Sequence, residues 1–294
     1  MKFSLGPILY FWSYQKVTDF YAAALDSPVD IIYLSETVCH KRNELTLEDW
    51  IDIAKVINAA GKQAVLSTMT LVESRADLSL VKKVCDNGVF LVEANDMSAV
   101  NWLSERKLPF CTGPAINIYN PQALKLLQRK GLQRWTLPVE LDKHCLHDIL
   151  RQSDVSKIET EVFSYGKLPL AYSARCFTAR ANNTEKDHCN LACIEHPEGL
   201  LMRTQEQQEL FTINGIQTLS GQIYDVRSEL GSMSDIGVDI MRFSPEENSL
   251  QAIKELHHEP FGSFNQTKNI ASDKVNGYWH GQPGIQYVDG NSLT

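Results

Sequence analysis

Short apolar runs alternate with amphipathic stretches along most of the chain. The runs have the length and composition of buried strands. They cover 2–9, 30–35, 63–68, 89–94, 109–114, 134–139, 157–163 and 239–244. Between them, 47–61 repeats apolar residues at helical spacing, and 120–131 opens with an Asn cap followed by Pro. The alternation predicts βα units and a parallel sheet.

The number of these units favours a closed barrel. An open doubly wound sheet usually has fewer strands and often carries a glycine-rich phosphate loop. Neither G-x-G-x-x-G nor G-x-x-x-x-G-K-[ST] occurs in the chain. We therefore predict an α/β protein with a (β/α)8 TIM-like barrel. The run 239–244 supplies the eighth strand, with helices predicted at 221–234 and 246–257 on either side of it.

The remaining segments are predicted to decorate a single barrel domain that comprises residues 1–294. Residues 164–220 form an insertion after the seventh strand, and 258–294 form a short tail. No apolar stretch is long enough to span a bilayer, and Gly6-Pro7 interrupts the first run, which favours a buried strand over a signal peptide. A net charge of -8 argues against nucleic acid or an anionic membrane as a broad partner. We expect a cytoplasmic protein.

Three of the seven cysteines crowd into the polar stretch 172–197. Cys176, Cys189 and Cys193 lie in the insertion, and Cys39 follows the second strand. Loops at the carboxyl ends of barrel strands open on one mouth, so the four thiols could meet there. An iron–sulfur cluster, a zinc site and the absence of any metal all remain open on spacing alone. His40, His188 and His196 are either zinc ligands or ordinary surface or capping residues.

Other side chains are weaker candidates. Arg42 and Arg175 adjoin the cysteines and could offset the charge of thiolates. Asn117, Glu140 and Arg242 follow or end predicted strands, where they could bind a substrate or form salt bridges and hydrogen bonds between loops. The three other cysteines, Cys85, Cys111 and Cys145, lie within predicted helices or strands and are expected to be small apolar residues.

Residues 161–176 resemble the signature E-x-F-x-x-G-x-x-C-x-x-x-S-x-x-C of the collagenase-like peptidase family. The matching positions are Glu161, Phe163, Gly166, Ser173 and Cys176. Position 169, where the signature has a cysteine, is Pro169. The stretches 210–221, 235–245 and 276–285 are similar to the UbiV branch of that family. In that branch a cysteine after the second strand, here Cys39, replaces the missing ligand.

The resemblance implies a [4Fe–4S] cluster held by Cys39, Cys176, Cys189 and Cys193. It also implies a heterodimer with a UbiU-like member of the family and an accessory UbiT-like lipid-binding protein. The function expected from it is that of an iron–sulfur subunit supporting oxygen-independent, anaerobic hydroxylation in ubiquinone biosynthesis. The alternatives are a metal-stabilised scaffold or binding subunit without redox chemistry, and a collagenase-like peptidase. Proteolysis is less expected, because no H-E-x-x-H motif and no activating base for Ser173 can be identified.

Overall fold

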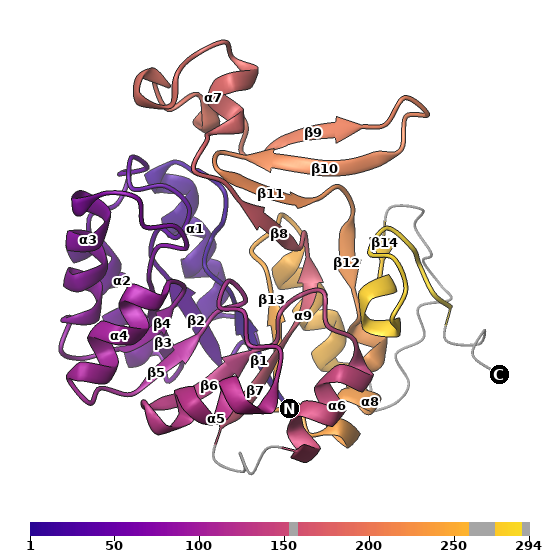
Figure 1. Cartoon of the computed structure of the whole chain (residues 1–294). Coiled ribbons are helices and arrows are strands. Elements are labelled where there is room, and N and C mark those ends of the chain that lie inside the picture. Colours follow the sequence, from indigo (N-terminus) through magenta and orange to yellow (C-terminus); the bar gives the residue numbers. More distant parts are fainter. Residues whose placement is uncertain (153–157, 259–273, 290–294) are drawn as a thin grey trace.

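Eight parallel strands close into a barrel in the computed structural model, which describes residues 1–152, 158–258 and 274–289 (Figure 1). The strands are β1 (Lys2–Leu5), β2 (Ile31–Leu34), β3 (Gln63–Ser67), β4 (Leu91–Ala94), β5 (Phe110–Thr112), β6 (Leu132–Thr136), β7 (Glu159–Gly166) and β13 (Ile240–Phe243). They pair in this order, and β13 closes the ring by pairing in parallel with both β7 and β1. The predicted (β/α)8 barrel is therefore confirmed.

Within the described ranges, eight α-helices surround the barrel. They are α1 (Tyr14–Leu25), α2 (Leu47–Ala59), α3 (Arg75–Cys85), α4 (Met97–Glu105), α5 (Pro121–Arg129), α6 (Lys143–Gln152), α8 (Leu230–Ile236) and α9 (Ser249–His258). Local sequence sets several of their ends. Thr46 and Asp49 form a capping box on α2, and the Asn120 side chain accepts a hydrogen bond from the Ala123 amide at the start of α5.

The prediction of a helix at 221–234 was wrong for the first half of that range. The strand β12 (Ile223–Asp225) and the 3₁₀-helix η3 (Arg227–Glu229) occupy that segment, and α8 begins only at Leu230. β12 pairs antiparallel with the end of β7, where Tyr224 lies opposite Gly166. The long seventh strand therefore provides an edge that captures a segment with little helical pattern of its own.

Two apolar regions hold the barrel together. The larger packs the outer faces of the strands against the helices and buries Trp135, Phe110 and Phe243 completely. Burial of each such side chain contributes roughly 1.5–3 kcal/mol. The smaller cluster contains Ile31, Tyr33, Val65, Cys111 and Ile240. All five come from strands and none from a helix, which places this cluster in the interior of the barrel.

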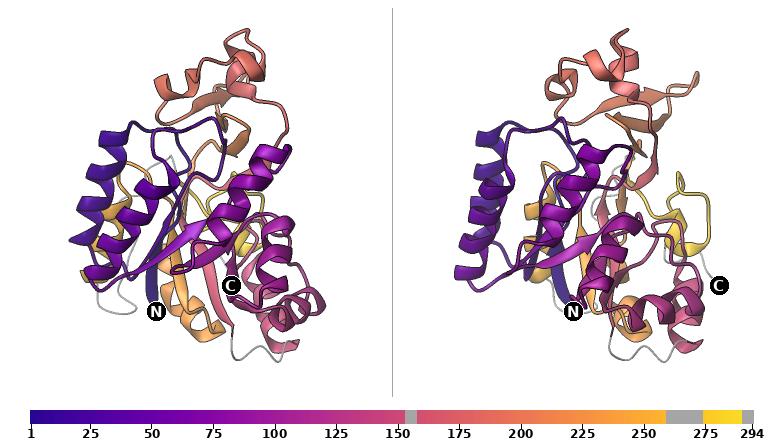
Figure 2. Two further views of the ribbon diagram at one scale, coloured as in Figure 1. Left: turned by 90° about the vertical axis from the view of Figure 1, so that its left-hand side faces the viewer. Right: turned by 60° about the vertical axis from the view of Figure 1, so that its left-hand side comes forward.

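The insertion carries a second sheet, to which the sequence analysis assigned no strands. Its antiparallel order is β8 (Pro169–Tyr172), β11 (Gln217–Ser220), β10 (Glu209–Asn214) and β9 (Leu200–Arg203). Between β8 and β9 lie α7 (Phe177–Ala181) and the 3₁₀-helices η1 (Lys186–His188) and η2 (Ala192–Glu195). Figures 1 and 2 show these elements stacked over one end of the barrel, with the β9–β10 hairpin projecting sideways.

The described part of the tail packs against the barrel wall. It contains β14 (Lys274–Val275), which pairs in parallel with β12, and the 3₁₀-helix η5 (Gly277–His280). Trp279 is fully buried, and its Nε1 donates a hydrogen bond to Glu229 Oε2 over 3.2 Å. Residues 259–273 and 290–294 of the predicted tail lie outside the described residues.

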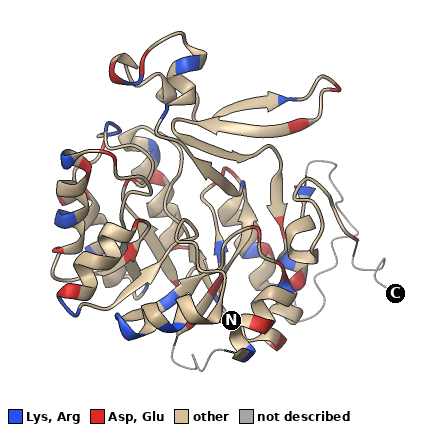
Figure 3. Cartoon of the chain, viewed as in Figure 1, with Lys and Arg blue, Asp and Glu red and all other residues tan. Residues whose placement is uncertain are grey.

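Charged residues of both signs are interspersed over the helices of the face in Figure 3. This mixture agrees with the modest acidic balance of the whole chain. No helix within the described ranges is long and apolar enough to cross a membrane.

Candidate metal centre

The loop after β2, residues 35–46, lies against the insertion at the mouth of the barrel. Lys41 of this loop donates from Nζ to the Lys186 carbonyl over 2.8 Å and contacts Asp187 Oδ1 at 3.2 Å. A second contact comes from the loop after β1, where Trp12 Nε1 donates to the Pro197 carbonyl over 2.8 Å. The two cysteine-bearing segments are therefore neighbours in space.

Arg42 is the centre of this junction. Its side chain is 1% exposed. Nη1 donates to the Leu9 carbonyl over 2.9 Å, and Nη2 donates to Asn214 Oδ1 over 2.7 Å. Asn214 Nδ2 also donates to the Leu9 carbonyl over 2.7 Å. One guanidinium thus joins the loop after β1, the loop after β2 and the strand β10 of the insertion.

Cys176 is positioned by the turn that connects β10 and β11. It caps α7, where its Sγ accepts a hydrogen bond from the Ala179 amide over 3.4 Å. The Phe177 amide donates to the Gly215 carbonyl, and the Gly215 amide donates to Thr178 Oγ1, each over 2.9 Å. These bonds tie the first turn of α7 to the residue that follows Asn214.

Three of the four candidate thiols share one electrostatic environment. Burial raises the pKa of Cys39 and of Cys193, the Arg42 guanidinium opposes this in both, and the Cys176 thiol adds to it in both. Cys39 and Cys193 therefore both lie near the buried Arg42, and Cys176 lies near each of these two thiols. Cys189 lies four positions before Cys193, at the end of η1.

The chemistry of this group fits a sulfur-ligated centre. All four thiols are free and partly exposed. Four thiolates are the donor set of a [4Fe–4S] cluster and of a structural zinc site. Arg42 Nε is buried and has no hydrogen-bond partner in the described part of the chain, so an N–H beside Cys193 is left for an anionic sulfur. Within the same ranges, no three Cys, His, Asp or Glu side chains converge as a metal-binding group.

The histidines next to the cysteines do not join this group. His40 Nδ1 pairs with Asp77 at the start of α3, at 2.5 Å. His188 is largely exposed and lies 3.6 Å from Glu185. The His196 amide donates to the Cys193 carbonyl at the end of η2, and the His196 carbonyl accepts a hydrogen bond from the Gly199 amide.

Arg242 lies inside the barrel rather than on a loop. Its Nη2 is 2.5 Å from Glu93 Oε1, and its Nε is 3.2 Å from Glu161 Oε1. Glu161, the first residue of the signature, also accepts from Tyr33 Oη over 2.6 Å and from Thr136 Oγ1 over 3.1 Å. Burial raises the pKa of Glu161, but Arg242 and Arg134 outweigh this effect and hold it below its usual range. Arg242 thus forms salt bridges, as one of its two interpretations expected, but its partners lie on barrel strands and not on loops.

The other candidates are scattered over the surface. Asn117, Glu140 and Arg175 are exposed. Glu140 accepts a hydrogen bond from the Tyr119 hydroxyl, and the backbone amide of Arg175 donates to Ser173 Oγ. Among the described residues, no hydrogen bond or ion pair joins any of the three to Arg242 or to a candidate cysteine ligand.

Asn214 and Gly215 are the functional positions that the sequence analysis missed. They hold Arg42 and the start of α7, respectively. The signal was present, because Asn-Gly between two short apolar runs is a strong indication of a tight hairpin turn.

Comparison with known proteins places the chain in a family. The model for Peptidase family U32 matches residues 14–257. Among solved structures, the U32 peptidase Mk0906 has 12% identity and a TM-score of 0.46, covering 84% of this chain and 94% of that one. A type I 3-dehydroquinate dehydratase from Clostridium difficile has 8% identity, coverages of 87% and 92%, and a TM-score of 0.46.

A family 18 N-acetylglucosaminidase from Paenibacillus barengoltzii has 9% identity, coverages of 86% and 99%, and a TM-score of 0.45. All three TM-scores lie below 0.5, so the assignment depends on the family match and not on these structures. That match spans most of the chain and includes the signature at 161–176. The chain belongs to peptidase family U32.

Proposed function

We propose that this chain is the [4Fe–4S] subunit of a UbiU–UbiV-type complex that supports oxygen-independent hydroxylation in ubiquinone biosynthesis. One observation carries the proposal. Cys39, which belongs to a different loop, lies with Cys193 near the buried Arg42, whereas position 169 of the signature is a proline. In this proposal, Cys39 supplies from across the mouth of the barrel the ligand that the insertion lacks.

Pro169 supports this exchange. It is the first residue of β8, it is buried, and it lies opposite Leu219 of β11. Proline fits the start of a strand, and its ring packs where a ligand side chain is not needed. The signature position has become part of the wall of the insertion.

The protein side chains have defined tasks in this proposal. Cys39, Cys176, Cys189 and Cys193 would hold the cluster, which when bound would supply one-electron transfer. Arg42 offsets the negative charge of thiolates and is itself fixed by Leu9 and Asn214. The insertion lies over this end of the barrel (Figure 2).

Partner proteins belong to the same proposal. A UbiU-like family member and a UbiT-like lipid-binding protein follow from the resemblance, as does a cytoplasmic location. Apolar side chains of the insertion are exposed and available for such contacts: Phe177, Ile194, Leu201 and Met202.

The direct test is anaerobic purification followed by iron, sulfide and zinc analysis with a visible spectrum. We expect about four irons and four sulfides per chain and a band at roughly 400 nm. Cys39→Ala should lower the iron content and the band. Cys145→Ala, which removes a lone exposed cysteine on α6, should change neither. Full iron retention in Cys39→Ala would refute the ligand assignment.

The function is tested separately by anaerobic growth of cells lacking this chain. Expression of the wild type should restore ubiquinone, and Cys39→Ala should not, while Cys145→Ala should. Zinc at about one per chain in the purified protein would instead favour a scaffold role without redox chemistry. The peptidase alternative has no support at Ser173, whose Oγ accepts from the Arg175 amide and from no histidine among the described residues.

A further inference from the structure

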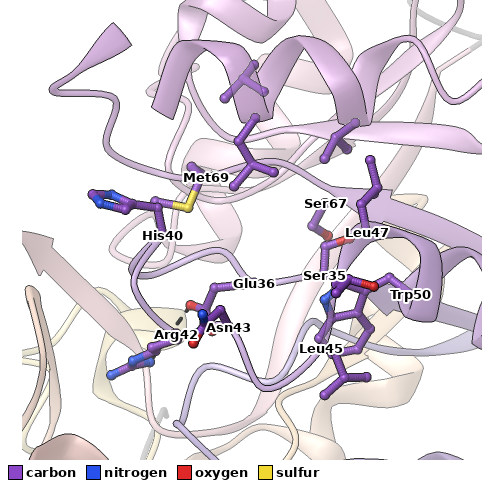
Figure 4. Close-up of a pocket in the computed structure, with 14 residues that line it drawn as sticks. Ser35, Glu36, His40, Arg42, Asn43, Leu45, Leu47, Trp50, Ser67 and Met69 are labelled. Carbon is purple, nitrogen blue, oxygen red and sulfur yellow. Dashed lines mark ion pairs between the residues drawn. The ribbon is translucent and has the colours of Figure 1, made fainter. Parts of the chain in front are cut away.

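A cavity lies outside the barrel, between the loop 35–46 and the helices α2 and α3 (Figure 4). Its volume is about 190 Å³. A cavity of about 150 Å³ can hold benzene, so this one has room for a small aromatic molecule. It lies apart from the buried network around Arg242, and it shares Glu36, His40 and Arg42 with the loop that carries Cys39.

The walls of this cavity are largely apolar. Trp50 of α2 and Leu80, Val81 and Val84 of α3 face it, and Leu45, Leu47 and Met69 complete the lining. Figure 4 shows Trp50 and Leu47 on one side, with Met69 and His40 on the other. Such walls bind an apolar body through burial of surface.

Ser35 places a buried hydroxyl group in the lining of the cavity. It is 5% exposed, and its hydroxyl has no hydrogen-bond partner in the described part of the chain. Its φ is 97°, a region that residues other than glycine rarely adopt. A buried hydroxyl without a partner and an unfavourable backbone occur at the same residue. Both are disfavoured in a merely structural position, and such strain is concentrated at ligand sites.

The charged groups of the lining are already occupied. Arg42 donates to Leu9 and Asn214, and Glu36 Oε1 accepts from the amides of Val38 and Cys39 over 2.7 and 3.0 Å. His40 is paired with Asp77. Arg42 also lies 3.9 Å from Glu36. The charged groups of the described lining are therefore matched by groups of opposite sign, although Arg42 Nε has no hydrogen-bond partner among the described residues, and this favours an uncharged molecule.

We propose that this cavity binds a small neutral molecule with a compact apolar body and one hydroxyl or carbonyl group, which pairs with Ser35 Oγ. Simple phenols and alcohols have this chemistry. The site shares Arg42 with the surroundings of the cysteines, but the hydrogen bond to Ser35 and the apolar contacts do not require a bound metal.

Binding is measured on the full chain by isothermal titration calorimetry with three probes that share a methylphenyl body: p-cresol, toluene and p-toluate. We expect p-cresol to bind in a saturable manner, toluene about 2- to 10-fold more weakly because it lacks the hydrogen bond, and p-toluate not at all. Equal binding of p-toluate and p-cresol, or no binding of p-cresol, would overturn the proposal.

Two variants of Ser35 distinguish the effect of losing the hydroxyl from the effect of relieving the backbone strain. Ser35→Ala and Ser35→Gly should each weaken p-cresol binding about 2- to 10-fold. Only Ser35→Gly should raise the melting temperature, because glycine tolerates the positive φ. Ser98→Ala is the control, since the Ser98 hydroxyl on α4 is also without a partner but lies outside the cavity.

A third variant blocks the cavity without touching Ser35. Leu80 is partly buried in the wall, and Leu80→Trp adds an indole where the probe body should lie. This variant should lose p-cresol binding while keeping the cooperative unfolding of the wild type. Unchanged affinity in Leu80→Trp, or in both Ser35 variants, would show that the probe binds elsewhere and would refute the site.

Discussion

Arg42 and Asn214 are 172 residues apart in the sequence, yet Arg42 Nη2 donates to Asn214 Oδ1 over 2.7 Å. Both side chains are buried, and both also bond to the Leu9 carbonyl. This contact decides how the cysteine-bearing insertion lies on the barrel. It joins the loop that supplies Cys39 to the strand that leads into the turn beneath Cys176.

Asn214→Ala should therefore destabilise the protein. It leaves a buried guanidinium N–H without its acceptor, which costs about 1–3 kcal/mol in the free energy of unfolding. Urea denaturation under anaerobic conditions measures the effect. Asn101→Ala, which removes an exposed amide on α4, should stay within about 0.5 kcal/mol of the wild type. A similar small change in Asn214→Ala would mean that the insertion is held by other contacts.

Gly215→Ala should disturb the same junction from the other side. Gly215 has a φ of 66°, and an added Cβ would lie 3.0 Å from Arg42 Nη2. Gly61→Ala is the matched control, because Gly61 has a φ of 81° and nothing within 4 Å of an added Cβ. Both variants carry the backbone strain of roughly 1 kcal/mol, and only Gly215→Ala also displaces Arg42. Equal melting temperatures in the two variants would contradict the packing argument.

Glu246 should make stability depend on pH near neutrality. Burial is the main cause that raises its pKa to about 7, and its Oε1 accepts from Tyr10 Oη and the Lys167 amide at 3.0 and 3.1 Å. The folded state therefore binds a proton more tightly than the unfolded chain does. Its contribution is favourable at acidic pH and is lost as the pH rises from about 4.5 to about 7.

The Glu246 effect is expected to be about 1–2 kcal/mol, less than the full pKa shift implies, because the residue is partly exposed and screened by solvent. Glu246→Gln should flatten the dependence of the unfolding free energy on pH between about 4.5 and about 7, the window between the unfolded and the folded pKa. Glu247→Gln, at an exposed neighbour, should leave it unchanged. An identical slope in both variants would assign the dependence to another group.

Arg242→Leu should be among the most damaging single changes in the barrel. It leaves Glu93 and Glu161 buried without their common cation, at a cost of about 3–5 kcal/mol. Lys2→Met removes an exposed ion pair with Glu159 and should cost less than about 1 kcal/mol. Guanidinium chloride unfolding compares the two. A loss in Arg242→Leu as small as that in Lys2→Met would mean that the carboxylates become protonated or hydrated.

The barrel could be predicted because its strands are buried on both faces and read as apolar runs. The insertion could not, because its strands are short and partly exposed. Leu201 and Met202 of the edge strand β9 are 41% and 47% exposed, so the alternation that marks a half-buried strand is missing there. The segment that forms β12 was mistaken for helix because its pairing partner, β7, is distant in sequence.

Only those features of the candidate site that depend on residues close together in the sequence could be predicted. The spacing of Cys176, Cys189 and Cys193, together with barrel geometry, indicated that these residues and Cys39 share one mouth. The role of Arg42 as the link between loops depends on Leu9 and Asn214, and no local pattern reports such contacts. For the same reason Arg242 was left with two interpretations, since its carboxylate partners lie on β4 and β7.

The way the insertion leaves and rejoins the barrel bears on how proteins of this kind diverge. The chain exits after Gly166 and returns at Tyr224, and these two residues lie opposite each other in the β7–β12 pair. Because the exit and the return are adjacent, everything between them can lengthen, shorten or change its side chains without shifting the register of a barrel strand. Evolution can therefore vary the insertion while the barrel strands keep their pairing, and Pro169, at a position where the signature has a cysteine, lies within this variable segment.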